Sequence, residues 1–178
     1  PWTARRHAQS VSGTALTDSF SAFATDNDGP AIARRVDYLF FHELMHNWIG
    51  HRILIRDKER QYWFSEGFTE YFQLQLRLRT GLLTPAGYVA EVNREFVRPL
   101  YRSPVRHAPN DSITYQRFWT SRDYEKLPYR RGMLFALYLD AHLKRTTAYS
   151  LADCMRALLA RASPTRRFAD AELLAVIR

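Results

Sequence analysis

The chain sets two histidines and a glutamate into one apolar stretch, in the sequence HELMH at residues 42–46. An α-helix turns once in about 3.6 residues, so His42 and His46 project from the same face. Two neutral imidazole nitrogens can then reach one Zn²⁺ at about 2.0–2.1 Å. Glu43 is expected beside the metal, where it can take a proton from water and pass it to a leaving amine. The pattern predicts a catalytic metal site.

A catalytic zinc usually takes three protein ligands and keeps one open position. Glu66 is the best candidate for the third ligand, because the residues after His46 suffice for a link and a return on a second helix. Glu70 lies one helical turn further on. It could accept a hydrogen bond from a ligand histidine or be an ordinary exposed glutamate. His51 could compete as a ligand, but it is expected beyond the end of the first helix. One Zn²⁺ per chain is therefore predicted.

The remaining histidines and the single cysteine carry no such pattern. His7, His107 and His142 have no ligand spacing and are expected to be structural or exposed. One cysteine, Cys154, cannot form an internal disulfide or a cysteine-built zinc site. It stands in the helical pattern SLADCMRALLARA, which predicts a small buried thiol.

The bulk composition limits the function classes. The 178 residues are 46% hydrophobic, which is enough to bury a sizeable core, and no apolar run approaches a membrane span. The net charge is +8, but no nucleic-acid motif accompanies it. A solvated basic surface is the preferred interpretation, with a nucleic-acid-binding module as the weaker alternative. The N-terminus has neither an initiator Met nor the apolar middle of a signal peptide, so we expect a piece of a longer protein.

The apolar periodicity predicts a mainly helical chain. Residues 1–30 are expected to be an irregular or partly extended lead-in, ending in the turn cluster TDNDGP. Four of the eight prolines fall in residues 99–128, which are expected to form a long loop. Helices are expected over 31–50, about 65–81, from Thr84 onward, and over 129–145, 150–162 and 169–178, with a short strand or link at 52–56.

Four segments resemble the gluzincin metallopeptidases, and among them the glycyl aminopeptidase family most. They read HELMHNWIGHRI, WFSEGFTEYF, LPYRRGMLFALYLDAHLK and SLADCMRALL, and they follow in this order from residue 42 to residue 159. The resemblance implies a thermolysin-like, mainly helical catalytic domain with the zinc site between two helices. It implies His42, His46 and Glu66 as zinc ligands and Glu43 as the general base.

The resemblance also implies a catalytic role for Tyr129. Related aminopeptidases carry a site tyrosine in a Y-x-x-G setting, and YRRG supplies Tyr129 and Gly132 here. Its phenol could donate to the oxyanion of a tetrahedral intermediate, and Tyr124 could assist. The alternative is an ordinary aromatic residue at a helix start.

One segment departs from the family pattern. The family has a glycine-rich segment with a glutamate that helps to hold the free amine of the substrate. The matching piece, SGTALTDSF, keeps Gly13 and has Asp18 as its only acid.

The expected function is zinc-dependent hydrolysis of peptide bonds, as an aminopeptidase acting on a peptide substrate. The alternative is a catalytically degenerate zinc- or peptide-binding domain of the same fold. Residues 1–178 are expected to be a single catalytic domain. The family resemblance implies flanking domains in the full-length protein.

Overall fold

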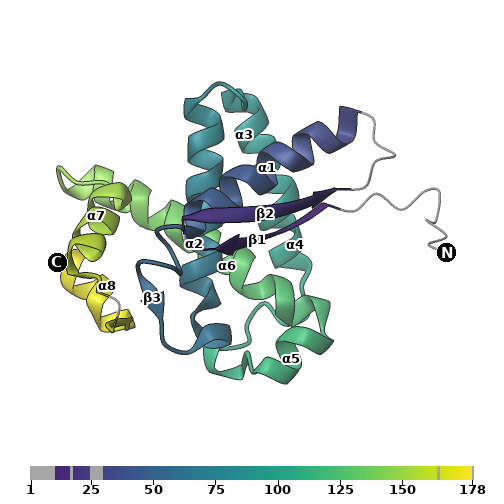
Figure 1. Ribbon diagram of the computed structural model, residues 1–178. Helices are drawn as coiled ribbons and strands as arrows, with labels where there is room; N and C mark the ends of the chain where they lie inside the picture. The colour runs from purple at the N-terminus through teal and green to yellow at the C-terminus, as the bar shows by residue number, and fades with distance from the viewer. Residues whose placement is uncertain (1–10, 17, 25–29, 164, 178) are drawn as a thin grey trace.

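The computed structural model describes residues 11–16, 18–24, 30–163 and 165–177, and it is mainly α-helical, as predicted (Figure 1). A hairpin and one long helix come first: β1 (Val11–Leu16), β2 (Ser19–Ala24) and α1 (Pro30–His46). The middle holds β3 (Leu54–Ile55), α2 (Lys58–Arg79), α3 (Pro85–Glu91), the π-helix η1 (Val92–Val97), α4 (Arg98–Arg102), the 3₁₀ helix η2 (Asn110–Ser112) and α5 (Tyr115–Thr120). The last part holds α6 (Arg122–Thr146), α7 (Leu151–Arg161), β4 (Arg167–Phe168) and α8 (Asp170–Ile177). Among the described helices, none combines the length and the apolar character that crossing a membrane requires.

Of the two alternatives for the lead-in, irregular or partly extended, the extended one is confirmed over Val11–Leu16 and Ser19–Ala24, which form an antiparallel hairpin. Its register runs from Val11 opposite Ala24 to Leu16 opposite Ser19, and the hairpin packs on α1. Small and polar residues fill these strands, so they lack the apolar alternation that marks a strand in sequence. The turn cluster at residues 25–29 lies outside the described residues, and Pro30 begins α1.

Helix α1 ends at His46, four residues before the glycine expected to close it. Gly50 instead lies in the following turn with φ of +110°, a backbone conformation that favours glycine. The turn is held by hydrogen bonds from the Gly50 amide to the Ile53 carbonyl and from the Ile53 amide to the Trp48 carbonyl. It buries Ile49 and Ile53 in the core immediately after the last residue of the HELMH motif.

Helix α2 begins at Lys58 rather than near Ser65, because the polar segment KERQ also favours helix. Glu66 therefore lies in the third turn of α2 and not in its first. The predicted C-terminal glycine is confirmed: Gly81 has φ of +80° and its amide donates to the Leu78 carbonyl. The predicted start of the next helix is also confirmed, with the Thr84 hydroxyl accepting from the Gly87 amide at 3.0 Å.

The prediction of a long loop over residues 99–128 is wrong. This segment contains most of α4, then η2, α5 and the first two turns of α6. Pro99 occupies the first turn of α4, where proline is tolerated, and Pro128 lies inside α6. Pro128 is fully buried, so its packing offsets the backbone hydrogen bond that it removes. Tyr129 consequently lies within a long helix, not at a helix start.

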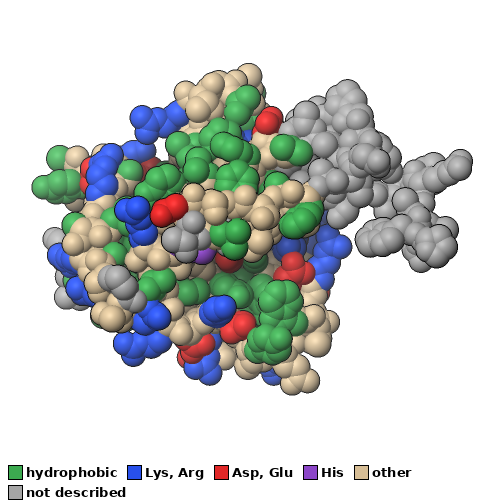
Figure 2. Space-filling view, viewed as in Figure 1, with side chains coloured by type: hydrophobic (Ala, Val, Ile, Leu, Met, Phe, Trp, Pro, Cys, Tyr) green, Lys and Arg blue, Asp and Glu red, His purple; other side chains and the backbone are tan. Residues whose placement is uncertain are grey.

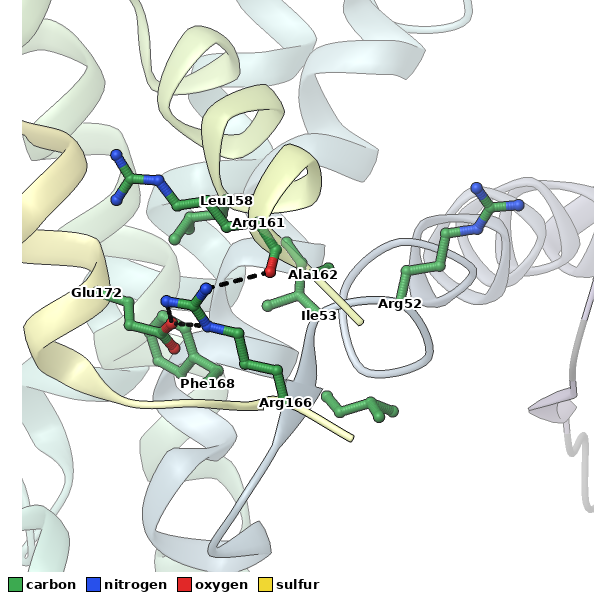
Figure 3. A pocket seen from close by; sticks show the side chains of 9 residues that line it. Arg52, Ile53, Leu158, Arg161, Ala162, Arg166, Phe168 and Glu172 are labelled. Carbon is green, nitrogen blue, oxygen red and sulfur yellow. Dashed lines mark hydrogen bonds and ion pairs between the residues drawn. The ribbon is translucent and has the colours of Figure 1, made fainter. Parts of the chain in front are cut away.

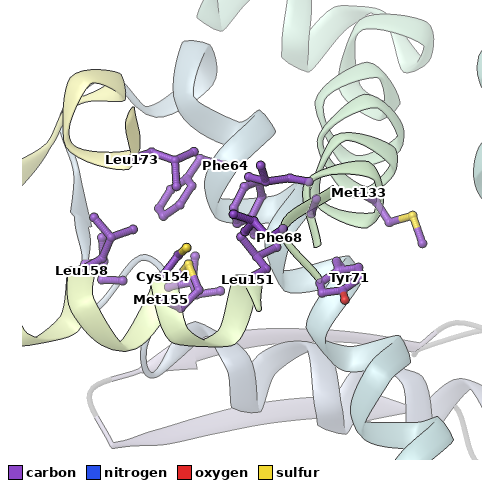
Figure 4. Packing of buried hydrophobic residues seen from close by; sticks show 14 of the residues in the cluster. Phe64, Phe68, Tyr71, Met133, Leu151, Cys154, Met155, Leu158 and Leu173 are labelled. Atoms are coloured by element: carbon purple, nitrogen blue, oxygen red, sulfur yellow. The ribbon is translucent and has the colours of Figure 1, made fainter. Parts of the chain in front are cut away.

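The main core forms where α2 crosses α6 and continues onto α7 and α8 (Figure 4). Aromatic side chains of α2 meet Met133 of α6 on one side and the apolar faces of α7 and α8 on the other. The labelled core residues are Phe64, Phe68, Tyr71, Met133, Leu151, Cys154, Met155, Leu158 and Leu173. The predicted burial of the Cys154 thiol is confirmed.

A buried carboxylate, Asp140, ties three of these helices together. It accepts hydrogen bonds from the Tyr71 hydroxyl of α2 at 2.6 Å and from the Leu151 amide at the start of α7 at 2.8 Å. Lys144 of its own helix lies 2.6 Å away. Burial raises the pKa of Asp140, but these partners outweigh burial and hold the pKa below its usual value. The carboxylate therefore fixes the ends of α6 and α7 against α2.

Helices α2 and α6 touch through their backbones at two glycines. A Cβ atom added to Gly67 would lie 2.4 Å from Cα of Gly132. A Cβ atom added to Gly132 would lie 1.9 Å from the carbonyl oxygen of Trp63. Real Cβ atoms do not come this close to backbone, so both positions require glycine at this crossing.

Replacing Gly132 with alanine is expected to lower the free energy of unfolding by about 1–3 kcal/mol or more, because the new methyl group must push two backbones apart. Urea denaturation followed by circular dichroism measures the change. The matched control is Gly87→Ala, whose Cβ would meet only side-chain atoms, at 3.2 Å or beyond. A Gly132→Ala variant as stable as the Gly87→Ala control would contradict the close-crossing argument.

Candidate metal centre

Helices α1 and α2 bring together the three residues predicted to bind metal. The Nε2 atoms of His42 and His46 lie 3.1 Å apart. One oxygen of Glu66, Oε2, lies 3.4 Å from each of them. Within the described part of the chain, these residues form the one group of three or more His, Cys, Asp or Glu side chains with ligand atoms this close together.

These separations fit a tetrahedrally coordinated ion. A tetrahedral site with bonds of about 2.0–2.1 Å places its ligand atoms about 3.3–3.4 Å apart. The three measured distances between donor atoms are 3.1, 3.4 and 3.4 Å. A small divalent metal could therefore sit within bonding distance of all three donors without rearrangement of the helices.

The end of α1 fixes the protonation of His46. Its Nδ1 lies 3.0 Å from the carbonyl oxygen of Ile49. A carbonyl can only accept, so Nδ1 carries the proton and donates it. In the neutral ring the lone pair is then on Nε2, the atom that faces Glu66. The turn that ends α1 thus orients His46 with its Nε2 atom toward Glu66.

Glu70 is buried beside His42, which excludes the alternative of an ordinary exposed glutamate. Glu70 is only 3% exposed, and its Oε1 lies 3.4 Å from Nδ1 of His42. The Tyr38 hydroxyl donates to that oxygen at 2.5 Å, and Gln73 Nε2 donates to Oε2 at 3.2 Å. Glu70 is thus a buried partner of the site rather than an exposed helix glutamate.

Sequence reasoning missed Tyr38 and Gln73. Tyr38 precedes His42 by four residues, so it shares the face of α1 that carries both histidines. Gln73 follows Glu70 by three residues on α2 and is fully buried. Helical spacing counted outward from the predicted ligands was the signal that could have found both residues.

The electrostatics of the cluster favour a bound cation. Burial lowers the pKa of His42, but contacts with Glu66 and Glu70 outweigh burial and raise the pKa to about 10. Burial raises the pKa of Glu66, but the two imidazoles outweigh it and hold the pKa well below its usual value. The two buried carboxylates thus stabilise positive charge at this place.

Glu43 is buried beside the first strand. Its exposed fraction is 6%, and it follows His42 directly on α1. A Cβ atom added to Gly13 of β1 would lie 3.0 Å from Cγ of Glu43 and 3.0 Å from Cδ1 of Leu39. The hairpin therefore passes over Glu43 at a distance that only glycine permits without adjustment of the neighbours.

Tyr129 faces the candidate metal ligands from α6. Its ring is nearly parallel to the His42 ring, with centroids 6.4 Å apart and an interplanar angle of 14°. Burial and the negative charges of Glu66 and Glu70 raise the pKa of Tyr129 well above its ordinary value. The Arg117 guanidinium instead lies over the ring of Tyr124, with the guanidinium carbon 5.4 Å from the ring centroid.

The other histidines lie apart from this cluster, as predicted for those that the structure describes. His51 is exposed in the turn after α1. His107 accepts a hydrogen bond from Arg106 Nε at 3.0 Å, and His142 stacks on Tyr138. His7 lies outside the described residues.

A cleft of about 670 Å³ adjoins the candidate metal site. Glu70, Tyr38 and Tyr129 form part of its wall. The space-filling view shows a patch of histidine surface inside a hollow on one face of the molecule (Figure 2). A second hollow, between β3, α7 and α8, holds only about 10 Å³. There Arg166 reaches across to Glu172 and to the Arg161 carbonyl, so this space is too small for a ligand (Figure 3).

The sequence of this region also matches a known protein family. The family model of the M61 glycyl aminopeptidases matches residues 36–134, more than half of the chain. The chain belongs to the M61 glycyl aminopeptidase family. The matched segment runs from α1 into α6 and contains the three candidate ligands, Glu43 and Tyr129. A search of curated proteins for relatives of the whole chain finds no match.

If Glu66 is a metal ligand, Glu66→Ala is expected to weaken zinc binding of this M61 chain by more than about 100-fold. Loss of a residue that supports a ligand, such as Glu70, typically lowers metal affinity about 10–100-fold. The zinc affinity of Glu70→Gln should therefore lie between those of Glu66→Ala and the unmodified chain. Competition with a chromophoric chelator measures both affinities. The control is Glu59→Ala in the first turn of the same helix. Wild-type affinity in Glu66→Ala would exclude Glu66 as a ligand.

Proposed function

We propose that this chain is a zinc-dependent peptidase that hydrolyses peptide bonds as an aminopeptidase. The observation that carries the proposal is the convergence of His42, His46 and Glu66 within 4.8 Å in a chain of a peptidase family. Two imidazoles and one carboxylate are a donor set typical of catalytic zinc, with a fourth position left for water or substrate. One Zn²⁺ per chain follows from the single cluster found in the described residues.

Glu43 is the general base in this proposal. A bound zinc supplies a Lewis acid that polarises the peptide carbonyl and makes water more acidic. The Glu43 carboxylate accepts a proton from the attacking water as oxygen bonds to the carbonyl carbon. It then delivers that proton to the amine nitrogen as the carbon–nitrogen bond breaks. Burial beneath β1 keeps this carboxylate away from bulk water.

Tyr129 is the oxyanion donor in this proposal. Its raised pKa keeps the phenol protonated at neutral pH, so the hydroxyl can donate a hydrogen bond. The stacked contact with His42 holds the ring close to the metal ligands. A preorganised donor aimed at developing negative charge stabilises the transition state more than the ground state.

The aminopeptidase mode and the single-domain organisation of residues 1–178 are part of the proposal, as are flanking domains in the full-length protein. The family description supports aminopeptidase action. The hairpin supports the rival function, a zinc- or peptide-binding domain without catalysis. Its strands contain no carboxylate, and Asp18, in the turn between them, is 76% exposed at its side chain.

Glu43→Gln separates the two functions. The amide keeps the shape of the side chain but cannot accept the proton, so turnover is expected to fall about 10²–10⁴-fold. Zinc content should be unchanged, because Glu43 is not among the three ligands. Hydrolysis of amino-terminally free and blocked peptides by the zinc-loaded protein measures the effect and the exopeptidase mode. Hydrolysis at the wild-type rate would remove Glu43 from the mechanism, and a wild-type chain that binds zinc without cleaving any peptide would support the rival.

Tyr129→Phe is expected to lower kcat about 10²-fold with a small change in KM, since the lost hydrogen bond forms in the transition state. Steady-state kinetics on the same peptide measure both constants. Tyr124→Phe serves as the control, because that ring packs under Arg117. A rise in KM with kcat unchanged would make Tyr129 a substrate-binding residue instead.

A further inference from the structure

The cleft beside the candidate metal site has the size of a ligand pocket. Its volume of about 670 Å³ lies inside the range of about 300–1,000 Å³ found for small-molecule and cofactor sites. Tyr129 and Glu70, which both lie next to the candidate ligand His42, line it. A peptide held at the metal would therefore extend along this cleft.

One wall of the cleft is a stripe of α6. Arg122, Lys126, Tyr129 and Arg130 all line it. Their spacing of four, seven and eight residues from Arg122 places them on one face of a helix. Three positive charges thus flank the tyrosine that the proposed mechanism uses.

The facing wall comes from α3 and the π-helix η1. Glu91, Arg94, Glu95 and Phe96 line the cleft from this side. The wider turn of a π-helix is costly and recurs at functional sites. Here it turns a charged segment toward the cleft while Val92 and Phe96 remain buried.

Most charges of the cleft are already paired. Arg77 Nη1 lies 2.6 Å from Glu91 Oε1, and Arg94 Nε lies 2.6 Å from Glu95 Oε1. Lys126 Nζ lies 2.5 Å from Oε1 of Glu125. A third acidic residue of the lining, Glu70, already contacts Tyr38, Gln73 and His42.

Arg122 and Arg130 are the two charged residues of the α6 wall that have no paired partner in the described part of the chain. In the described part of the chain, neither guanidinium makes a hydrogen bond or a close ion pair. Arg130 is half-buried. Burial lowers its pKa and Arg122 lowers the pKa further, while the more distant carboxylates of Asp123, Glu95 and Glu125 act in the opposite direction. A half-buried guanidinium without a close counter-ion is costly, and a bound anion would remove that cost. Asp37 is the one lining carboxylate for which the described side chains provide no close partner.

We propose that Arg130, assisted by Arg122, binds a carboxylate of the substrate, so that the chain prefers peptides carrying an acidic side chain or a free C-terminal carboxylate within reach of the cleft. This inference rests on the proposed peptidase function. Guanidinium groups bind carboxylates with two parallel hydrogen bonds, and such charge-assisted bonds are stronger than neutral ones. Arg131, the next residue, is already used, since it donates to the Ala108 carbonyl and to Asn110.

Peptide binding to the zinc-loaded Glu43→Gln variant tests the proposal without turnover. The probes are tetra-alanine amide, tetra-alanine with a free C-terminus, and amides with one glutamate or one glutamine at each position after the first. At least one carboxylate probe is expected to bind about 10-fold or more tightly than its neutral counterpart. The glutamate series and the free C-terminus distinguish the two sources of the carboxylate. Isothermal titration calorimetry measures the affinities.

The same comparison is then made after substitution of the arginines. Arg130→Gln is expected to abolish the preference, Arg130→Lys to keep part of it, and Arg122→Gln to reduce it. Arg145→Gln, on the exposed surface of the same helix, should leave the preference unchanged. Circular dichroism confirms the fold of each variant, and Arg122→Gln remains as the test if Arg130 variants do not fold.

Three outcomes would overturn the inference: equal binding of carboxylate and neutral probes, binding of none of the probes, or a preference that survives in Arg130→Gln. The outcomes are distinct from those of the proposed function. A carboxylate preference in a wild-type chain that never hydrolyses peptides would overturn the peptidase proposal alone. Hydrolysis with no carboxylate preference would overturn this inference alone.

Discussion

The contact between Gly67 and Gly132 determines how closely α2 and α6 can approach. With no side chains at either position, the two backbones meet directly, and Gly132 lies against the Trp63 carbonyl. Glu66 is the neighbour of Gly67, and Tyr129 is one turn before Gly132 on α6. The crossing point therefore sets the separation between the candidate third ligand and the candidate oxyanion donor. This gives the Y-x-x-G spacing a physical reason, because the tyrosine and the glycine face the same neighbouring helix.

Local periodicity predicted the two histidines, because spacing along one helix is fixed by its geometry. Glu66 was predicted by its type and distance along the chain, and the structure brings it to both Nε2 atoms even though α2 begins earlier than expected. Its position depends on the turn after α1, where Gly50 reverses the chain. Sequence could suggest that reversal but could not fix the angle between the helices.

The wrong predictions from sequence share one cause, which is that tertiary contacts override local patterns. Prolines in residues 99–128 predicted a loop, but burial of Pro128 stabilises a helix that its local preference opposes. The polar KERQ segment has no apolar pattern and still extends α2. Helical spacing places Tyr38 near His42 and Gln73 near Glu70, but only the burial of the Glu70 carboxylate shows that it needs both side chains as donors. Tertiary packing and polar satisfaction decided each of these positions.

Helix α1 has little apolar anchorage of its own. Among the side chains described in residues 36–46, Leu39 is the one buried apolar residue and Met45 packs partly buried against the main core, whereas Val36 and Phe40 are exposed. The other buried side chains there are His42 and Glu43. Attachment of α1 and its hairpin to the α2–α6 core thus depends largely on polar contacts through Glu66 and Glu70. An ion bridging α1 and α2 would hold these helices together, and metal exchange would be coupled to local detachment of α1 and its hairpin.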